Sequence, residues 1–94
     1  MNTRESLLVG FRSKLQKVII NYQNLYVNSD VDREDFLKVS VHPLNEEIAR
    51  LTAITVNDQL LEDDMTFDKE FMIEVTTISL DTVTDFVKNI KEKI

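Results

Sequence analysis

The chain has 94 residues, of which 43% are hydrophobic and 30% are charged, and these values are typical of one small globular domain. Its single glycine and its lack of cysteine exclude glycine-rich nucleotide-binding loops, disulfides and thiol catalysis, and its single histidine excludes multi-histidine metal sites. It has neither an apolar run of about 18 residues nor a secretory signal pattern, so we expect a cytoplasmic protein that does not enter membranes and is not an enzyme.

The net charge of −6 is distributed unevenly along the chain. Residues 1–27 carry four basic side chains and one acidic side chain, whereas residues 28–94 carry seven basic and sixteen acidic ones. This asymmetry suggests different partners for the two parts, although a solvated helix face beside an acidic, solubilising surface would give the same pattern. The overall acidity argues against a uniformly basic nucleic-acid binder.

An amphipathic helix is predicted over residues 1–27, where Asn2 and Glu5 have the spacing of a capping box. Apolar residues then recur at alternating steps of three and four, as in a coiled-coil seam: Leu8, Phe11, Leu15, Val18, Tyr22 and Leu25. Such a helix, about 36 Å long, exceeds what a compact domain of this size needs. We therefore interpret the stripe as a homodimer seam, with packing against the chain's own sheet as the alternative.

Antiparallel strands are predicted over residues 36–56. Apolar residues alternate with polar ones at the period of a strand: Leu37, Val39 and Val41. Pro43 cannot donate to a strand ladder, so we place it in the connection between two strands. Residues 48–56 are ambiguous, because Pro43 would also suit the first turn of a helix, but their β-branched residues favour a second strand.

A C-terminal helix is predicted over residues 79–94, with Ser79 as its N-cap and lysines near its end. Residues 67–78 fit either a helix face or a strand face, and both readings stay open. The expected fold class is therefore α+β, in a single domain over 1–94 with a long N-terminal amphipathic helix, a small antiparallel sheet and a C-terminal helix.

Side chains that could carry chemistry are few and poorly spaced. The polar residues between 28 and 35 resemble a calcium loop but lack the glycine and the final glutamate of such a loop. Three adjacent acids at 62–64 cannot all face one cation, and His42 has no readable serine or cysteine partner. Residues 78–86 echo a helix-turn-helix recognition helix, but their acids would repel phosphate. No catalytic, metal-binding or cofactor-binding residue is therefore predicted.

Two segments resemble parts of a known family. Residues 54–64 read Ile-Thr-Val-Asn-Asp-Gln-Leu-Leu-Glu-Asp-Asp, a predicted strand followed by an acidic shoulder, and residues 37–41 would supply a central strand. With this order of elements the chain resembles the YbaB/EbfC family of nucleoid-associated proteins. The resemblance implies a tweezers-shaped homodimer whose protruding helices contact double-stranded DNA with little sequence preference. The chain departs from the family at residues 42–45, where the family's hairpin usually carries glycine.

The expected function is sequence-tolerant binding of the DNA backbone by a homodimer. Positive side chains from both ends of the sequence would meet phosphates: Arg4, Arg12, Lys14, Lys17, Lys88, Lys91 and Lys93. On a helical wheel the four N-terminal ones spread loosely, which weakens this reading. The alternative is a non-enzymatic protein–protein interaction module, such as a small regulator or a phage-type accessory protein, that binds an unidentified protein partner and no nucleic acid.

Overall fold

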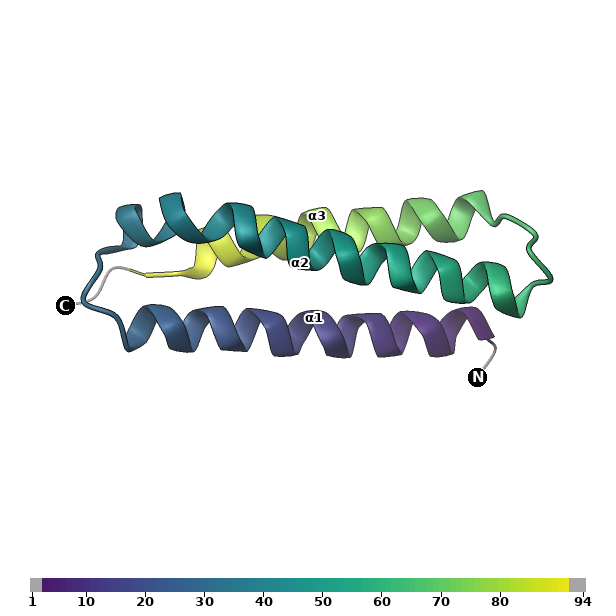
Figure 1. Ribbon diagram of the computed structural model, residues 1–94, viewed down its shortest axis with the longest axis horizontal. Helices are drawn as coiled ribbons and strands as arrows, with labels where there is room; N and C mark the ends of the chain where they lie inside the picture. Colours follow the sequence, from purple (N-terminus) through teal and green to yellow (C-terminus); the bar gives the residue numbers. More distant parts are fainter. Residues whose placement is uncertain (1–2, 92–94) are drawn as a thin grey trace.

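The computed structural model describes residues 3–91 and contains three α-helices and no strand within that range. They are α1 (Thr3–Val27), α2 (Arg33–Glu62) and α3 (Lys69–Asn89). Figure 1 shows that α1 and α3 run in the same direction and that α2 runs back in the opposite one. The bundle measures 51 × 22 × 16 Å, so its Cα radius of gyration of 15.2 Å exceeds the roughly 12 Å expected of a compact domain of this size.

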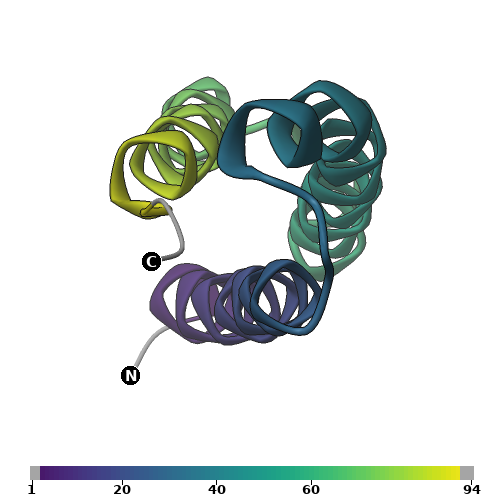
Figure 2. The same cartoon turned by 90° about the vertical axis from the view of Figure 1, so that its left-hand side faces the viewer.

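The three helices surround one shared core, as the view along the long axis shows (Figure 2). The most deeply buried side chains come from all three: Phe11, Leu44, Phe71, Val75 and Phe86. Aromatic contacts join the elements, because the ring centroids of Tyr22 and Phe86 lie 6.4 Å apart and those of Tyr26 and Phe36 lie 5.0 Å apart. Burial of a stripe at helical spacing therefore stabilises each helix against the other two.

The predicted α+β fold is wrong, because residues 36–56, expected as antiparallel strands, lie inside α2. The buried positions of α2 follow helical spacing: Phe36, Ser40, Leu44, Ile48, Leu51, Thr55 and Gln59. Three of these seven residues are polar, so the apolar residues alone do not show the helical spacing of the buried side. The strand pattern depended on Val39, whose side chain is 69% exposed. The sheet implied by the family resemblance is likewise absent from the described residues.

The buried hydroxyl groups of α2 are compatible with a helix because they bond to its own backbone. The Oγ of Ser40 donates to the carbonyl oxygen of Phe36 at 2.6 Å, and the Oγ1 of Thr55 donates to that of Leu51 at 2.9 Å. Each hydroxyl is therefore satisfied one turn back along α2, and its burial leaves no orphaned donor.

Pro43, which we expected in a connection, also lies inside α2. A proline has no N–H to donate to the carbonyl of residue i−4, here Val39. Pro43 and Val39 are both exposed, so water can bond that carbonyl. The neighbouring Leu44 is fully buried, and the core contacts on that side keep the helix continuous through the proline.

The C-terminal helix begins earlier than predicted. Asp68 is the N-cap of α3, and its carboxylate accepts a hydrogen bond from the backbone N–H of Phe71 at 3.0 Å. Of the two readings of residues 67–78, the helical one is correct from Lys69 onward, whereas the N-cap assignment of Ser79 is wrong because Ser79 lies within α3. The predicted cap residue Asn2, the last residues of the predicted helix at 92–94 and with them Lys93 lie outside the described residues.

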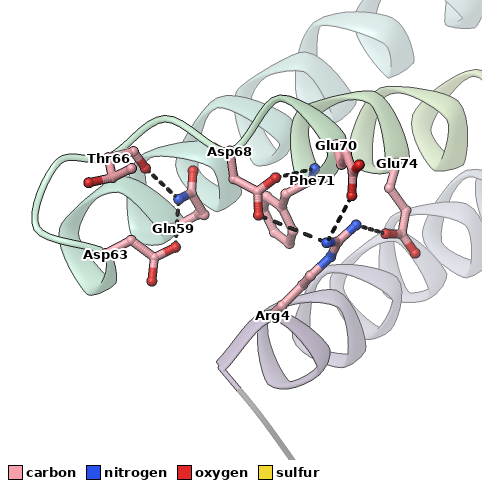
Figure 3. A network of polar contacts seen from close by, with 8 residues as sticks. All are labelled: Arg4, Gln59, Asp63, Thr66, Asp68, Glu70, Phe71 and Glu74. Carbon is pink, nitrogen blue, oxygen red and sulfur yellow. Dashed lines mark hydrogen bonds and ion pairs between the residues drawn. The ribbon is translucent and has the colours of Figure 1, made fainter.

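A tight turn joins α2 to α3. Asp64 and Met65 have φ angles of 50° and 65°, and the N–H of Met65 donates to the carbonyl five residues earlier at 2.6 Å, which is the bond of a Schellman motif. The buried Gln59 donates through Nε2 to the Asp63 carboxylate at 2.7 Å and to the Thr66 carbonyl at 2.8 Å (Figure 3). Backbone and side-chain bonds together fix the shape of this turn.

Candidate functional site

An open groove of about 610 Å³ runs between α2 and α3. Its lining comes from these two helices: Asn45, Ile48, Ala49, Thr52, Ala53, Val56, Asn57, Leu60, Met72, Thr76, Ser79, Leu80 and Val83. None of these side chains is charged, although 30% of the residues of the chain are. An uncharged hollow on so highly charged a surface makes this groove the candidate site.

Both walls of the groove arise from a second stripe that runs beside the core stripe of each helix. The steps are four, three and four on both helices: Asn45, Ala49, Thr52 and Val56 on α2, and Met72, Thr76, Ser79 and Val83 on α3. On α3 the corresponding core residues lie one position earlier: Phe71, Val75 and Ile78. Each helix therefore turns one side to the core and the adjacent side to the groove.

The floor of the groove holds one pair of hydroxyl groups, and they bond to each other. The Oγ1 of Thr52 and the Oγ of Ser79 lie 2.7 Å apart. Thr52 also bonds the carbonyl of Ile48 at 2.8 Å, and Ser79 bonds that of Val75 at 3.0 Å. Each hydroxyl has one proton, so two protons serve these three contacts and neither is left to donate to a polar ligand.

The edges of the groove combine large and small side chains. Leu80 and Met72 are 64% and 43% exposed, so they stand above the floor on the α3 side. Ala49 and Ala53 are also exposed, but each extends only one carbon from the backbone. The α2 side is therefore low at Ala49 and Ala53, opposite Leu80, and a partner helix could approach α2 closely there.

Arg4 ties the start of α1 to the start of α3 (Figure 3). Its Nη2 donates to the Glu74 carboxylate at 2.9 Å, and its Nη1 lies 3.9 Å from the carboxylates of Asp68 and Glu70. The hydrogen bond to Glu74 raises the pKa of the Arg4 guanidinium above its ordinary value, and the neighbouring negative charges add to that shift. Arg4, predicted as a DNA contact, is thus engaged with three carboxylates of its own chain.

The remaining acids of α3 also lie on the side that faces α1. Asp81 and Asp85 line a second cavity of about 430 Å³ together with Arg12 of α1, another predicted DNA contact. Together with Glu70 and Glu74, they place all four acids of α3 toward α1. Two of the four cations of α1, Arg4 and Arg12, therefore face acids of the same chain.

The other basic residues predicted to contact DNA do not form one surface with the arginines. Lys14 and Lys17 are exposed on α1, whereas Lys88 and Lys91 are exposed at the far end of α3. The length of α3 separates that end from Arg4 by about 30 Å. The structure therefore distributes these cations along the bundle, with Lys93 outside the described residues.

The predicted homodimer seam is largely occupied within the chain. Phe11, Leu15 and Val18 are buried in the core, and Leu8 and Tyr22 are half-buried against it. Only Leu25 of the six residues is exposed, at 53%. The stripe is thus the core side of α1, which matches the alternative of intrachain packing except that the partner is a pair of helices instead of a sheet.

In the described part of the chain, no group of three or more histidine, cysteine or acidic side chains is placed to hold a metal ion. His42 lies on α2 with its Nε2 2.9 Å from the carboxylate of Glu46, and both side chains are mostly exposed. No helix within residues 3–91 has the length and apolarity needed to cross a membrane.

The sequence did not predict the groove, because charged residues and catalytic residue types were the basis for predicting sites. Its signal was the absence of charge from one side of α3, visible once Met72, Thr76 and Val83 are placed on a helix. The chain matches no known protein family, no curated protein and no solved structure at a significant level. The resemblance to the YbaB/EbfC family therefore stays an untested prediction.

Proposed function

We propose that this protein is a non-enzymatic interaction module that binds another protein chain through the α2–α3 groove. The observation that carries the proposal is the uncharged lining of that groove, with Leu80 and Met72 exposed at its edge. Large exposed apolar side chains beside a hollow are typical of surfaces that bind proteins.

The dimensions of the groove favour a helical ligand. It extends from Asn45 to Leu60 on α2, which is about 22 Å, or four turns of helix. A helix laid between α2 and α3 would contact both with side chains spaced three and four residues apart. A small polar molecule would gain fewer hydrogen bonds there, because the hydroxyls of Thr52 and Ser79 already bond to each other.

Site-specific photo-crosslinking in cells that produce the protein tests this proposal. A benzoylphenylalanine in place of Leu80 should yield protein adducts, whereas the same group in place of Val9, which is similarly exposed on α1, should not. Ala53→Glu, which puts a charge on the opposite wall, should abolish the adducts at position 80. Failure to obtain adducts that depend on the groove would contradict the proposal.

Binding of the DNA backbone is the competing proposal, and the geometry gives it less support. Arg4 and Arg12 face acids of their own chain, which leaves Lys14 and Lys17 as the exposed cations of α1. With about two phosphate contacts per chain, the slope of log affinity against log salt would be only about −1.8. A duplex mobility shift at low salt that Lys14→Gln and Lys17→Gln abolish would favour DNA binding over the interaction module.

A further inference from the structure

We propose that the chain which fills the groove is a second copy of this protein, docked groove to groove about a twofold axis. This inference rests on the proposed function, because it names the partner of the same surface. Three properties of the groove carry it: the placement of charge around it, the shapes of its two edges and its area.

Charge favours contact between two copies on this side of the molecule. Each copy carries a net charge of −6, so copies repel each other wherever acids face acids. The groove is lined by uncharged residues, and the acids of α3 lie on its opposite side, against α1: Glu70, Glu74, Asp81 and Asp85. Two copies can therefore cover each other's grooves without burying an unpaired charge in the contact.

The two edges of the groove are complementary in shape. Leu80 and Met72 stand out on the α3 side, and Ala49 and Ala53 leave hollows on the α2 side. A twofold axis parallel to the groove places α3 of each copy over α2 of the other. Because Thr52 lies level with Ser79, Leu80 of each copy then meets the hollow between Ala49 and Ala53 of the other. Met72 lies farther along the groove, over Val56 and Leu60. Because projections and hollows lie on one surface, this surface is self-complementary, which is the requirement for a twofold dimer.

The area of the groove predicts a weak dimer. A surface about 22 Å long and two helices, or about 20 Å, wide presents about 450 Å² per copy, or about 900 Å² in total. Stable specific interfaces bury about 1,200–2,000 Å², so this contact falls just below that range. We therefore expect a dissociation constant of about 10–100 µM and a reversible equilibrium between monomer and dimer.

Sedimentation velocity over a range of concentrations tests the dimer directly. The wild type should shift from monomer to dimer between about 5 and 500 µM. Leu80→Glu and Ala53→Glu should each weaken association at least about tenfold, because each buries a charge in the contact, whereas Val9→Glu on α1 should not. All three positions are exposed, so thermal unfolding curves should confirm that each variant folds.

The dependence on salt separates this contact from a charge-driven one. Salt screens the repulsion between two acidic copies, so raising it from about 50 to 500 mM should leave the dimer unchanged or strengthen it. Association of the basic side of α1 with the acids of another copy would weaken instead. A wild type that stays monomeric at about 500 µM, or a dimer that Leu80→Glu does not affect, would overturn the inference.

Crosslinking at position 80 distinguishes failure of this inference from failure of the proposed function. A self-adduct has twice the chain mass of 11.0 kDa and forms with purified protein alone. A groove-dependent adduct of another mass, formed only in cells, would overturn the second copy as partner but leave the interaction module standing. The absence of any adduct in both settings would overturn both.

Discussion

Asp64 adopts a backbone conformation that glycine usually takes at the end of a helix. Its φ angle is 50°, at the position where the Schellman motif reverses the chain after α2. A β-carbon in this conformation meets the following carbonyl oxygen, which costs about 1 kcal/mol. The turn therefore contains a local strain that the bonds made by Gln59 offset.

Replacing Asp64 by glycine should stabilise the protein. We expect Asp64→Gly to raise the free energy of unfolding by about 0.5–1 kcal/mol, because the strain disappears and the Schellman bond remains. Urea unfolding monitored by circular dichroism measures the change. Asp63→Gly is the control, since Asp63 has a φ of −106° and bonds to Gln59; it removes the same charge and should give no gain. Equal gains from both would assign the effect to charge.

Ionisation of Tyr22 is expected to lower the free energy of unfolding at alkaline pH. Burial of its phenol raises the pKa above its ordinary value of about 10, and the negative charge of Glu47 adds to the shift. Tyr22 therefore ionises at a lower pH in the unfolded chain than in the folded chain. The contribution of this residue to stability is intact below pH 10 and is lost as the pH rises from there through the folded-state pKa.

The variant Tyr22→Phe should consequently lose less stability than the wild type between pH 9 and pH 11. Urea unfolding at the two pH values gives the loss for each protein, and every other titrating group contributes to both alike. Identical losses would show that the phenol of Tyr22 ionises equally in the folded and unfolded chains.

Arg33 connects two elements at the end of the bundle opposite to Arg4. Its Nε donates to the carbonyl of Ile90 and its Nη2 to that of Val87, both at 2.7 Å. Val87 lies in the last turn of α3 and Ile90 is its C-cap, and carbonyls at this end have no partner within the helix. The first residue of α2 therefore caps the end of α3, and the cation also suits the negative end of the helix dipole.

Removing this cap should loosen the end of α3. Arg33→Ala is expected to lower the free energy of unfolding by about 1–2 kcal/mol, and Arg33→Lys should recover only part of it because an ammonium cannot bond both carbonyls as a fork. Hydrogen exchange at the amides of Val87 to Ile90 should accelerate in Arg33→Ala. Lys38→Ala, which removes an exposed pair with Glu34, is the control and should change little.

The three helices differ in how far the sequence could predict them. α1 was predicted within two residues of its bounds, because its apolar stripe is regular and nothing competes with it. α2 was missed because polar side chains occupy core positions at Ser40, Thr55 and Gln59, where they bond to nearby backbone or to the following turn. The groove could not be predicted before α2 was known to be a helix, since eight of its thirteen lining residues come from there.

At the scale of the whole molecule, the core stripe of α1 determines whether the single chain folds. Leu15 is 3% exposed and packs against the other helices, whereas Leu25, from the same predicted seam, is 53% exposed. Leu15→Ala should lower the free energy of unfolding by about 2–5 kcal/mol, independently of protein concentration. Leu25→Ala should change it by less than about 0.5 kcal/mol. A concentration-dependent loss of stability at both positions would show instead that the apolar stripe of α1 is an interface between copies.

The parallel course of α1 and α3 also determines how the molecule responds to tension. Because the bundle has three helices, α1 begins and α3 ends near opposite ends of a body 51 Å long (Figure 1). A force pulling these ends apart acts along the helices, and they can separate only by sliding past one another. Sliding breaks many side-chain contacts at once, together with the bonds of Arg4 and Arg33. The contacts of a hairpin pulled from one end break in succession. The contacts of this bundle must break together, so we expect it to unfold at a higher force than such a hairpin.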